Sequence, residues 1–359
     1  MSDVEALVKG ILRDSNINLE SPFKIYKYQE VMSRYGIDKP DLRLDYSITK
    51  IDHLLPVDLI SKISPLSRPA VDISVFKGSK AFNHDPSIAR TFIADFLESP
   101  QASVHNNNPD GAPGIFIYDS QKPLSGLQAF GFEAAEEVER IFDLEEGDLI
   151  VLQARPDTRF SGGSTALGRF MISLNRAAVE QGLKRLAPEL EFLWVIDFPL
   201  FTPISTEDKG QSGLAGLQST HHPFTSPKTP ADVDLLFEDP EAVVADHYDL
   251  VVNGVEVGGG SRRIHNADMQ RLVMEKILKM PPAKIQEFDH LLEALRAGCP
   301  PHAGFALGLD RFIAVLLGKE SVRDVIAFPK WGKGDDPMVK APARVNASEW
   351  NVYNLEPKA

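Results

Sequence analysis

The chain has 359 residues, of which 43% are hydrophobic and 25% charged, and this is enough apolar material for at least one large core. Its formal net charge of −13 means that the molecule as a whole repels polyanions, so a nucleic-acid partner would have to meet a local basic face. A single cysteine excludes an internal disulfide, and no apolar run approaches the ~20 residues of a membrane span.

The first residues predict a helix rather than a targeting sequence. Apolar residues recur at spacings of three and four up to about Leu19, which is typical of an amphipathic helix. The segment has neither a signal-peptide core nor the composition of a transit peptide, so we expect no N-terminal address in the chain as it stands. Residues 26–44 predict a short helix and a turn, and the apolar runs near Ile51 and Val71 predict strands.

The next block, residues 69–170, predicts an inserted α/β domain. A helix is expected over 86–97 and a polar loop over 106–114. The strand-like runs GIFIYD and GDLIVLQA follow, on either side of the charged helical segment EAAEEVERIF. The expected division of the chain is therefore residues 1–68 for the start of a core, the inserted block, and residues 171–359 for the rest of the core.

The part of the core that follows is predicted to be antiparallel. Helical spacing covers 169–186, the near-continuous apolar run 192–201 predicts one buried strand, and a polar loop follows at 202–220. Two β-rich runs flank Asn253 and Gly254, which is the strongest short-range signal for a hairpin.

The last predicted elements are two helices and a strand that passes into a helix. The helices are expected over 269–280 and 284–296, the second with an apolar stripe. The segment GFALGLDRFIAVLLG then reads as a strand followed by an apolar helix.

The predicted hairpin brings two carboxylates together. With Asn253 and Gly254 as turn residues, Glu256 pairs with Val251, and Asp249 becomes its diagonal neighbour on the same face. Like charges so placed repel unless a positive charge lies between them, and such oxygen pairs suit Mg²⁺ held together with substrate phosphates. A pair of solvated strand carboxylates is the alternative.

The glycines at 258–260 and the two arginines that follow raise a question of parity. Three glycines in a strand indicate a bulge or a close approach to the backbone, and a ligand over this surface would explain them. Glu256 and Arg263 are seven residues apart, which places them on opposite faces of a regular strand. Both reach one site only if the glycines insert a bulge; otherwise Arg262 is the arginine on the same face as Glu256. The planar guanidinium fits a carboxylate or phosphate, although surface arginines at strand edges are common.

The histidines have less specific interpretations. His221 and His222 precede Pro223, which favours an extended backbone, so their side chains point to opposite sides and joint chelation is not expected. One of them can bond a ligand while the other packs, and two structural histidines are an equal alternative. His247 has no predicted partner and is interpreted as structural.

The segment GFALGLDRF is a candidate anion site. Gly304 and Gly308 allow a flat ring or a phosphate to approach the strand, and Arg311 falls in the first turn of the next helix. The helix dipole disfavours a cation there, so this arginine is expected either to hold an anion such as a triphosphate or to pair with a nearby acid. The sequence contains neither a P-loop nor a Rossmann glycine motif, so ATP would bind in another way.

Taken in succession, six segments resemble a class II aminoacyl-tRNA synthetase, and closely the bacterial and mitochondrial type of aspartyl-tRNA synthetase. They are YGIDKPDLR, FLWVIDFPLF, HHPFTSPK, VVNGVEVGGGSRRIH, PPHAGFALGLDR and VRDVIAFPK. The resemblance covers nearly all of the chain outside 70–170, where this subtype carries an extra domain. It implies an α+β fold: part of a class II antiparallel sheet flanked by helices, with an inserted α/β domain.

The resemblance also implies roles for the substrate residues. His221 is similar to the histidine that contacts the aspartate substrate, and Arg263 to the arginine that binds its side-chain carboxylate and so rejects asparagine. Glu256, together with Asp249, resembles the carboxylates that bind ATP and Mg²⁺. This assignment favours Arg263 with a bulge over Arg262.

The third class motif of the family binds ATP, and four consecutive residues of this chain resemble it: Gly308, Leu309, Asp310 and Arg311. Its arginine contacts the triphosphate, and this arginine and Arg263 are the expected catalytic residues. In such enzymes an aspartate carboxylate attacks the α-phosphate of ATP, giving aspartyl-adenylate and pyrophosphate, and tRNA(Asp) then takes the aspartyl group. The implied chemistry is positioning and charge neutralisation rather than nucleophilic catalysis by a side chain.

The resemblance implies partners as well as departures. We expect the ligands L-aspartate, ATP, Mg²⁺ and tRNA(Asp), a homodimer as the assembly, and no association with a membrane. The subtype implies a location in the mitochondrial matrix, or in the cytoplasm if the chain as written is the real product. The anticodon-binding barrel and the first two class motifs are not matched, so we expect a truncated product with impaired or absent activity and an exposed sheet edge. A non-catalytic synthetase-like paralogue that binds ATP or a protein partner is one alternative, and an amide ligase of the asparagine-synthetase type is another.

Overall fold

The computed structural model describes residues 1–19, 21–204, 213–332 and 334–356. Its contacts divide the chain into two units, Met1–Ala306 and Leu307–Ala359, and each is described by itself.

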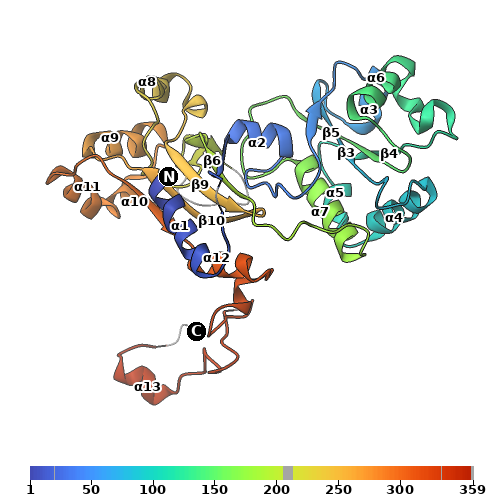
Figure 1. Cartoon of the computed structure of the whole chain (residues 1–359). Helices are drawn as coiled ribbons and strands as arrows, with labels where there is room; N and C mark the ends of the chain where they lie inside the picture. Colours follow the sequence, from blue (N-terminus) through green and yellow to red (C-terminus); the bar gives the residue numbers. More distant parts are fainter. Residues whose placement is uncertain (20, 205–212, 333, 357–359) are drawn as a thin grey trace. The chain divides into compact units, whose positions relative to one another are not determined.

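The first unit contains a five-stranded sheet in the order β1-β6-β9-β10-β11 (Figure 1). β1 runs parallel to β6, whereas the β6/β9 and β9/β10 pairs are antiparallel, as the sequence predicts for this half of the fold. The strands are β1 (Lys24–Lys27), β6 (Phe192–Ile196), β9 (His247–Val252), β10 (Val255–Arg262) and β11 (Ala303–Leu307).

The apolar run 192–201, predicted as one strand, forms two. β6 ends at Ile196, Asp197 takes a left-handed φ of 60°, and β7 (Phe201–Pro203) pairs with β8 (Leu217–Ser219) in a separate two-stranded sheet. The prediction was wrong because the turn falls inside a run whose composition is otherwise that of a strand. Residues 205–212 of the predicted polar loop lie outside the described part of the chain.

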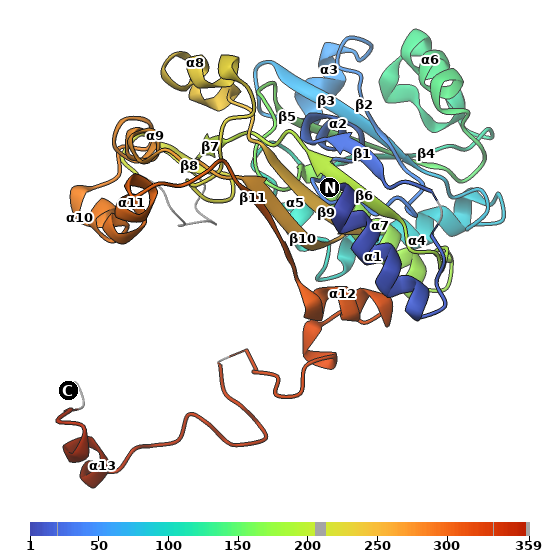
Figure 2. The ribbon, with the colours of Figure 1, turned by 60° about the vertical axis from the view of Figure 1, so that its left-hand side comes forward.

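A second sheet, antiparallel throughout, forms most of the inserted block (Figure 2). Its order is β2-β3-β5-β4, and the predicted strands near Ile51 and Val71 and at GIFIYD and GDLIVLQA all belong to it or adjoin it. The strands are β2 (Ile48–Lys50), β3 (Pro69–Phe76), β4 (Gly114–Ile117) and β5 (Leu149–Pro156). The three-part domain division stays a prediction.

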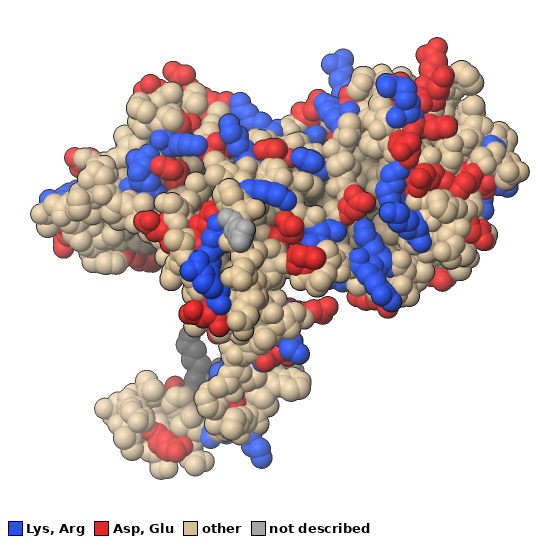
Figure 3. All heavy atoms as spheres, viewed as in Figure 1, with Lys and Arg blue, Asp and Glu red and all other residues tan. Residues whose placement is uncertain are grey.

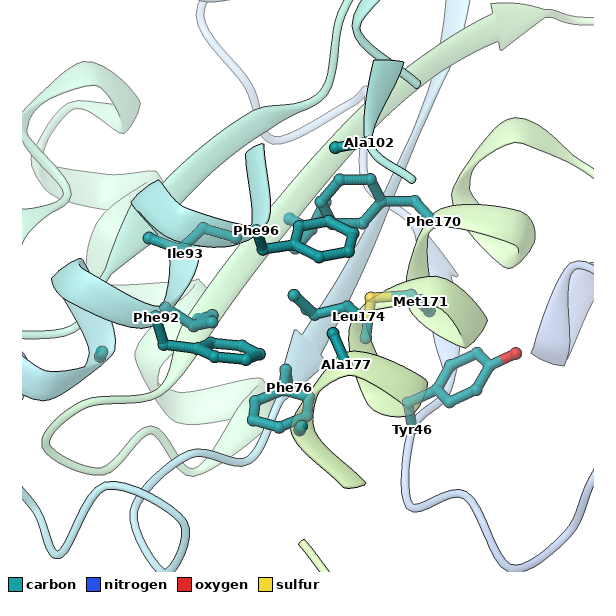
Figure 4. Close-up of a cluster of buried hydrophobic side chains, with 14 of the residues drawn as sticks. Tyr46, Phe76, Phe92, Ile93, Phe96, Ala102, Phe170, Met171, Leu174 and Ala177 are labelled. Carbon is teal, nitrogen blue, oxygen red and sulfur yellow. The ribbon is translucent and has the colours of Figure 1, made fainter. Parts of the chain in front are cut away.

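Helices cover both faces of this four-stranded sheet (Figure 1). Because side chains alternate along a strand, β3 and β5 supply apolar residues to both faces, and two separate cores result. Figure 4 shows the first core, where Phe92 and Phe96 lie opposite Phe170 and Leu174. α4 (Pro86–Glu98), α5 (Ser103–Asn106) and α7 (Ala166–Glu180) cover this face, and α3 (Val57–Ile63) and α6 (Phe132–Phe142) cover the other.

Three predicted helices have different ends in the structure. The one expected over 169–186 stops at Glu180, since Gly182 takes a φ of 72°. The one expected over 269–280 is α9 (Ala267–Leu272) followed by a π-helical turn, and the one expected over 284–296 is divided at Phe288 into two. The remaining helices of the first unit are α1 (Ser2–Asp14), α2 (Tyr28–Tyr35), α8 (Pro230–Glu238), α10 (Pro282–Gln286) and α11 (Asp289–Arg296).

The second unit begins where the last predicted strand gives way to the last predicted apolar helix. It contains α12 (Leu309–Leu316) and α13 (Ala347–Val352), so the predicted passage from strand to helix is confirmed. Among the helices in the described ranges, none has the length and apolarity needed to cross a bilayer.

Candidate active site

The loop after α2 is held at a fixed place over the five-stranded sheet. α2 packs its buried side on β6 and β9, and it ends at Gly36, whose φ is 67°. A Cβ at this position would lie 2.5 Å from Thr165 Oγ1, so the close approach requires glycine. The Gly36 carbonyl accepts a 2.8 Å hydrogen bond from the Thr165 backbone, and the Asp38 amide donates to the Gly163 carbonyl at 3.0 Å. These bonds fix the position of Asp38 and its neighbour Lys39.

The β9–β10 hairpin has the predicted turn, register and bulge. Asn253 and Gly254 both have positive φ, at 49° and 82°. Glu256 lies opposite Val251, and the register then shifts between Glu256 and Gly258. The shift is the bulge that the sequence required if Glu256 and an arginine seven residues on are to share one side of the sheet.

The three glycines of β10 are explained by the protein itself. A Cβ on Gly258 would lie 2.5 Å from the Phe305 ring, and one on Gly260 would lie 2.1 Å from the Gly304 carbonyl oxygen. β11 therefore approaches β10 too closely for side chains at these positions. A ligand over this surface is not needed to explain them.

The middle glycine, Gly259, marks the place where the two predicted carboxylates meet. A Cβ built there would lie 2.6 Å from Asp249 Oδ1 and 3.5 Å from Glu256 Oε1. The hairpin thus places both carboxylates on the same side of the strand pair, which is the arrangement predicted from the sequence.

Lys39, which the sequence analysis did not single out, lies among three carboxylates. Its Nζ is 2.6 Å from Asp38 Oδ2, 3.6 Å from Glu256 Oε2 and 4.0 Å from Asp249 Oδ2. This is the positive charge that the paired carboxylates needed. Since three acids face one ammonium group, the cluster retains an excess of negative charge that suits a further cation.

Burial and charge shift the pKa values of this cluster. Burial raises the pKa of Asp249 above its usual range, although His221 and Lys39 oppose the shift. Burial likewise raises the pKa of Asp38, against the effect of Lys39. Burial alone would lower the pKa of Lys39, but the charges of Asp38, Asp249 and Glu256 outweigh it and raise that pKa. The ammonium group therefore stays charged at neutral pH.

His247, interpreted from the sequence as structural, lies in the centre of the site. Its Nε2 is 2.8 Å from Asp249 Oδ1, and its ring stacks on that of His221 with centroids 3.6 Å apart and planes 14° apart. One signal could have found it: His247 and Asp249 are two apart on one strand, so they share a face.

The three histidines are neutral at physiological pH. Loss of hydration, reinforced by His247, lowers the pKa of His221 to about 3, even though this residue keeps an exposed edge. Loss of hydration, with Arg263 as the next cause, lowers the pKa of His222 to about 4, and burial lowers that of His247 to about 4. Neutral imidazoles can donate and accept hydrogen bonds without adding charge.

The two adjacent arginines point to different partners. Arg262 Nε bonds Asp246 Oδ2 at 2.7 Å, and its Nη2 donates to the Pro227 carbonyl at 2.7 Å. Arg263 instead contacts the ring of His222, and its charge lowers the pKa of His247. Arg263 is therefore the one of the pair that lies on the side of the site, as the bulge implied.

Two sets of side chains in this region have the donor atoms that metal ions prefer. Asp249 and Glu256 offer oxygens, and Asp249 Oδ2 is buried with no hydrogen-bond partner among the described residues, which fits Mg²⁺. Donor atoms of His221, His247 and Asp249 also lie within 4.8 Å of one another. Because the two imidazoles are stacked in parallel, their in-plane lone pairs do not meet at one ion, so this second set does not fit as it stands.

The residues of the predicted third motif lie in the second unit. Gly308 precedes α12, and Arg311 is exposed in the first turn of that helix. Their roles in binding ATP stay predictions. On the face drawn in Figure 3, basic and acidic side chains are interspersed.

Comparison with known proteins identifies the family. The model for "tRNA synthetases class II (D, K and N)" matches residues 1–332. The chain is 38% identical to the mitochondrial aspartate–tRNA ligase of Dictyostelium discoideum, over 96% of this chain and 50% of that protein. It is 34% identical to the human mitochondrial aspartate–tRNA ligase, over 98% and 53%, and 35% identical to the aspartate–tRNA(Asp/Asn) ligase of Opitutus terrae, over 99% and 58%.

The chain thus spans about half the length of the curated relatives that it matches. Among solved structures, the aspartyl-tRNA synthetase from Entamoeba histolytica is 17% identical, over 93% of this chain and 56% of that one, with a TM-score of 0.29, which is too low to add support. The family model alone covers most of the chain, in agreement with the segments that carry the resemblance. The chain belongs to the class II tRNA synthetase family of the D, K and N type.

Proposed function

We propose that the chain carries the aspartate-binding part of an aspartate–tRNA ligase active site. The observation that supports this most is the cluster in which Lys39 lies among Asp38, Asp249 and Glu256, with Arg263 on the same side of the sheet. A dicarboxylic amino acid presents one ammonium group and two carboxylates. The excess of acid in the cluster complements the ammonium group, and the guanidinium of Arg263 complements a carboxylate.

In the proposed reaction, a carboxylate oxygen of the aspartate α-carboxylate attacks the α-phosphorus of ATP and forms a new P–O bond. The bond from that phosphorus to the oxygen that bridges to the β-phosphate breaks, so aspartyl-adenylate forms and pyrophosphate leaves. Arg263 binds the side-chain carboxylate, His221 contacts the amino acid, and Arg311 of the third motif contacts the triphosphate. Asp249 and Glu256 would hold Mg²⁺, which when bound neutralises charge on the phosphates. No side chain acts as a nucleophile, so the residues contribute by binding and orientation.

Selection of aspartate over asparagine follows from Arg263. A carboxylate accepts two charge-assisted hydrogen bonds from a guanidinium. A side-chain amide has one acceptor oxygen, and its NH₂ group is itself a donor, so it cannot accept the second hydrogen bond. The site would thus leave donors unpaired when asparagine enters, which disfavours its binding.

The remaining proposals concern the setting of the reaction. We propose tRNA(Asp) as the acceptor, a homodimer as the assembly and the mitochondrial matrix as the location. Support comes from the mitochondrial aspartate–tRNA ligases among the relatives. We also propose residues 69–170 as a domain inserted in the core; its sheet packs in two apolar cores, to which residues 46–59 and 171–178 on either side also contribute.

The experiment is aspartate-dependent ATP–pyrophosphate exchange by the purified chain, preceded by equilibrium binding of aspartate and of ATP. Arg263→Gln is expected to weaken aspartate binding roughly 10- to 150-fold, which is ~1.5–3 kcal/mol for a hydrogen bond to a charged group. Arg262→Gln, the matched control, is expected to leave binding unchanged because that side chain bonds Asp246.

Two outcomes would contradict the proposal. Binding of aspartate that is insensitive to Arg263→Gln would remove the assigned role of this residue. Binding of ATP without any binding of aspartate would instead support the alternative, a non-catalytic synthetase-like protein.

A further inference from the structure

One residue of the site has no role in the reaction just described, yet it contacts two residues that do. His247 is 7% exposed on β9. The edge of its ring contacts Asp249 at 2.8 Å, and the face of its ring stacks on His221 at 3.6 Å.

We propose that His247 is a positioning residue that holds the Asp249 carboxylate through its ring edge and the His221 imidazole through its ring face. The proposal rests on the proposed function, because it assigns Asp249 and His221 to the binding of cation and amino acid.

The edge contact fixes the rotation of the carboxylate. Asp249 is 1% exposed, so water does not orient it, and a neutral His247 donates from Nε2 to Oδ1. The other oxygen, Oδ2, is then left toward Lys39 at 4.0 Å and has no hydrogen-bond partner among the described residues. A carboxylate with one satisfied and one unsatisfied oxygen is prepared to bind a cation.

The face contact fixes an exposed ring. His221 is exposed, and a free imidazole at the surface would sample several rotamers. The parallel stack on His247 removes that freedom, and Phe198 packs edge-on against both rings, with centroids 5.0 Å from His221 and 5.3 Å from His247. The stack is not opposed by charge repulsion, since both rings are neutral at physiological pH.

The two contacts can be separated by substitution. His247→Gln retains an amide NH₂ near the position of Nε2 but has no ring to stack. His247→Phe retains a ring but has no donor for Asp249. If His247 acts as proposed, each variant loses one function and keeps the other.

The two expected effects are measured separately, by titrating the full chain with Mg²⁺ in the presence of ATP and with aspartate. His247→Phe should raise the Mg²⁺ concentration needed for half-maximal ATP binding roughly 10- to 100-fold, the usual effect of losing an outer-shell partner, and leave the Kd for aspartate within about threefold. His247→Gln should raise the Kd for aspartate about 2- to 12-fold, the range of an aromatic pair, and leave the Mg²⁺ requirement nearly unchanged.

Controls exclude a general effect of the substitutions. His290, an exposed residue of α11, is changed to Phe and to Gln, and neither change should alter binding. If both His247 variants only lower the melting temperature, or shift the Mg²⁺ and aspartate dependences equally, His247 is a structural residue and the proposal is overturned.

A spectroscopic readout keeps the test independent of the proposed function. In ¹⁵N spectra of the ligand-free chain, His247 should be the Nε2–H tautomer, and His247→Gln should shift the ring signals of His221, because the stacked ring 3.6 Å away is lost. Should the unmodified chain bind no aspartate, the proposed function fails while these signals still decide the positioning role. Ring signals of His221 that do not change in the Gln variant would overturn it.

Discussion

The two large sheets of the first unit contain the same kind of residue in opposite situations. Asp148, fully buried beside β5, accepts hydrogen bonds from four donors: Lys77 Nζ at 2.9 Å and the backbone amides of Gly78, Ser79 and Glu145 at 3.0, 3.2 and 3.1 Å. Asp249, equally buried on β9, has its Oδ2 without a hydrogen-bond partner among the described residues.

The difference in hydrogen bonding distinguishes a structural carboxylate from one that serves a site. A buried carboxylate whose oxygens are all satisfied stabilises the loop that satisfies it. A buried carboxylate with an unsatisfied oxygen and a raised pKa costs stability, and it persists in a fold when a ligand or a reaction uses it. The Asp148 carboxylate therefore stabilises the loops beside the four-stranded sheet, whereas the Asp249 carboxylate belongs to the proposed site and lowers the stability of the five-stranded sheet.

The largest expected effect lies in the four-stranded sheet. Phe170 is fully buried in the first core of the four-stranded sheet, so Phe170→Ala should lower the free energy of unfolding by about 3–5 kcal/mol, as deletion of a core aromatic ring does. Urea denaturation measures the loss. Phe132→Ala, at a position 69% exposed on α6, is the control and should change stability by less than about 0.5 kcal/mol. Similar losses at the two positions would mean that the first core does not stabilise this sheet.

The next effect tests the satisfied carboxylate directly. Asp148→Ala removes the acceptor of four hydrogen bonds and leaves Lys77 without its ion-pair partner, so unfolding should become easier by roughly 3 kcal/mol. Guanidinium denaturation of the two proteins gives the value. Binding of aspartate by the folded fraction should be unchanged, and a change would show that the two sheets are coupled.

Alanine substitutions at two neighbouring glycines of β10 should affect different properties: stability at Gly260 and ligand binding at Gly259. The Cβ of Gly260→Ala would meet the backbone of β11, so about 1–3 kcal/mol of stability should be lost through overpacking. The Cβ of Gly259→Ala would meet the Asp249 carboxylate at 2.6 Å, so this variant should lose binding of ATP with Mg²⁺ by a larger factor than Gly260→Ala does. Thermal melts and titrations of both variants decide; equal losses of binding would contradict the distinction.

The smallest expected effect is a gain in stability when Asp249 is replaced by asparagine. Because the pKa of Asp249 in the folded chain is raised above 3.8, the folded state binds the proton more tightly, and its stability falls as pH rises from 3.8 through the folded pKa. Asp249→Asn does not titrate, so it should be more stable than the unmodified chain at pH 8, with no advantage below pH 3.8.

Urea unfolding of both proteins between pH 4 and 8 measures this gain. A loss of stability in Asp249→Asn at pH 8 would mean that Lys39 and His247 already satisfy the carboxylate, and the contrast with Asp148 would disappear.

Local patterns in the sequence predict the hairpin and its bulge. Asn253 and Gly254 accept the positive φ of a tight turn, which sets Glu256 opposite Val251, and the glycine run lets the strand shift register. These are short-range effects of backbone geometry, so a few adjacent residues are enough to determine them. The break at Asp197 shows the limit of the same reasoning, because a single turn residue inside an apolar run has no distinct composition.

By itself, therefore, the sequence predicts the order of most elements, the family, and the common face of Asp249 and Glu256. Only the tertiary structure brings Lys39 from the loop after α2 to these carboxylates and stacks His247 on His221. The physical reason is distance along the chain. Contacts within a hairpin follow from local conformation, whereas contacts between α2, the His221 segment and β9 depend on how whole elements pack, and no local pattern encodes that packing.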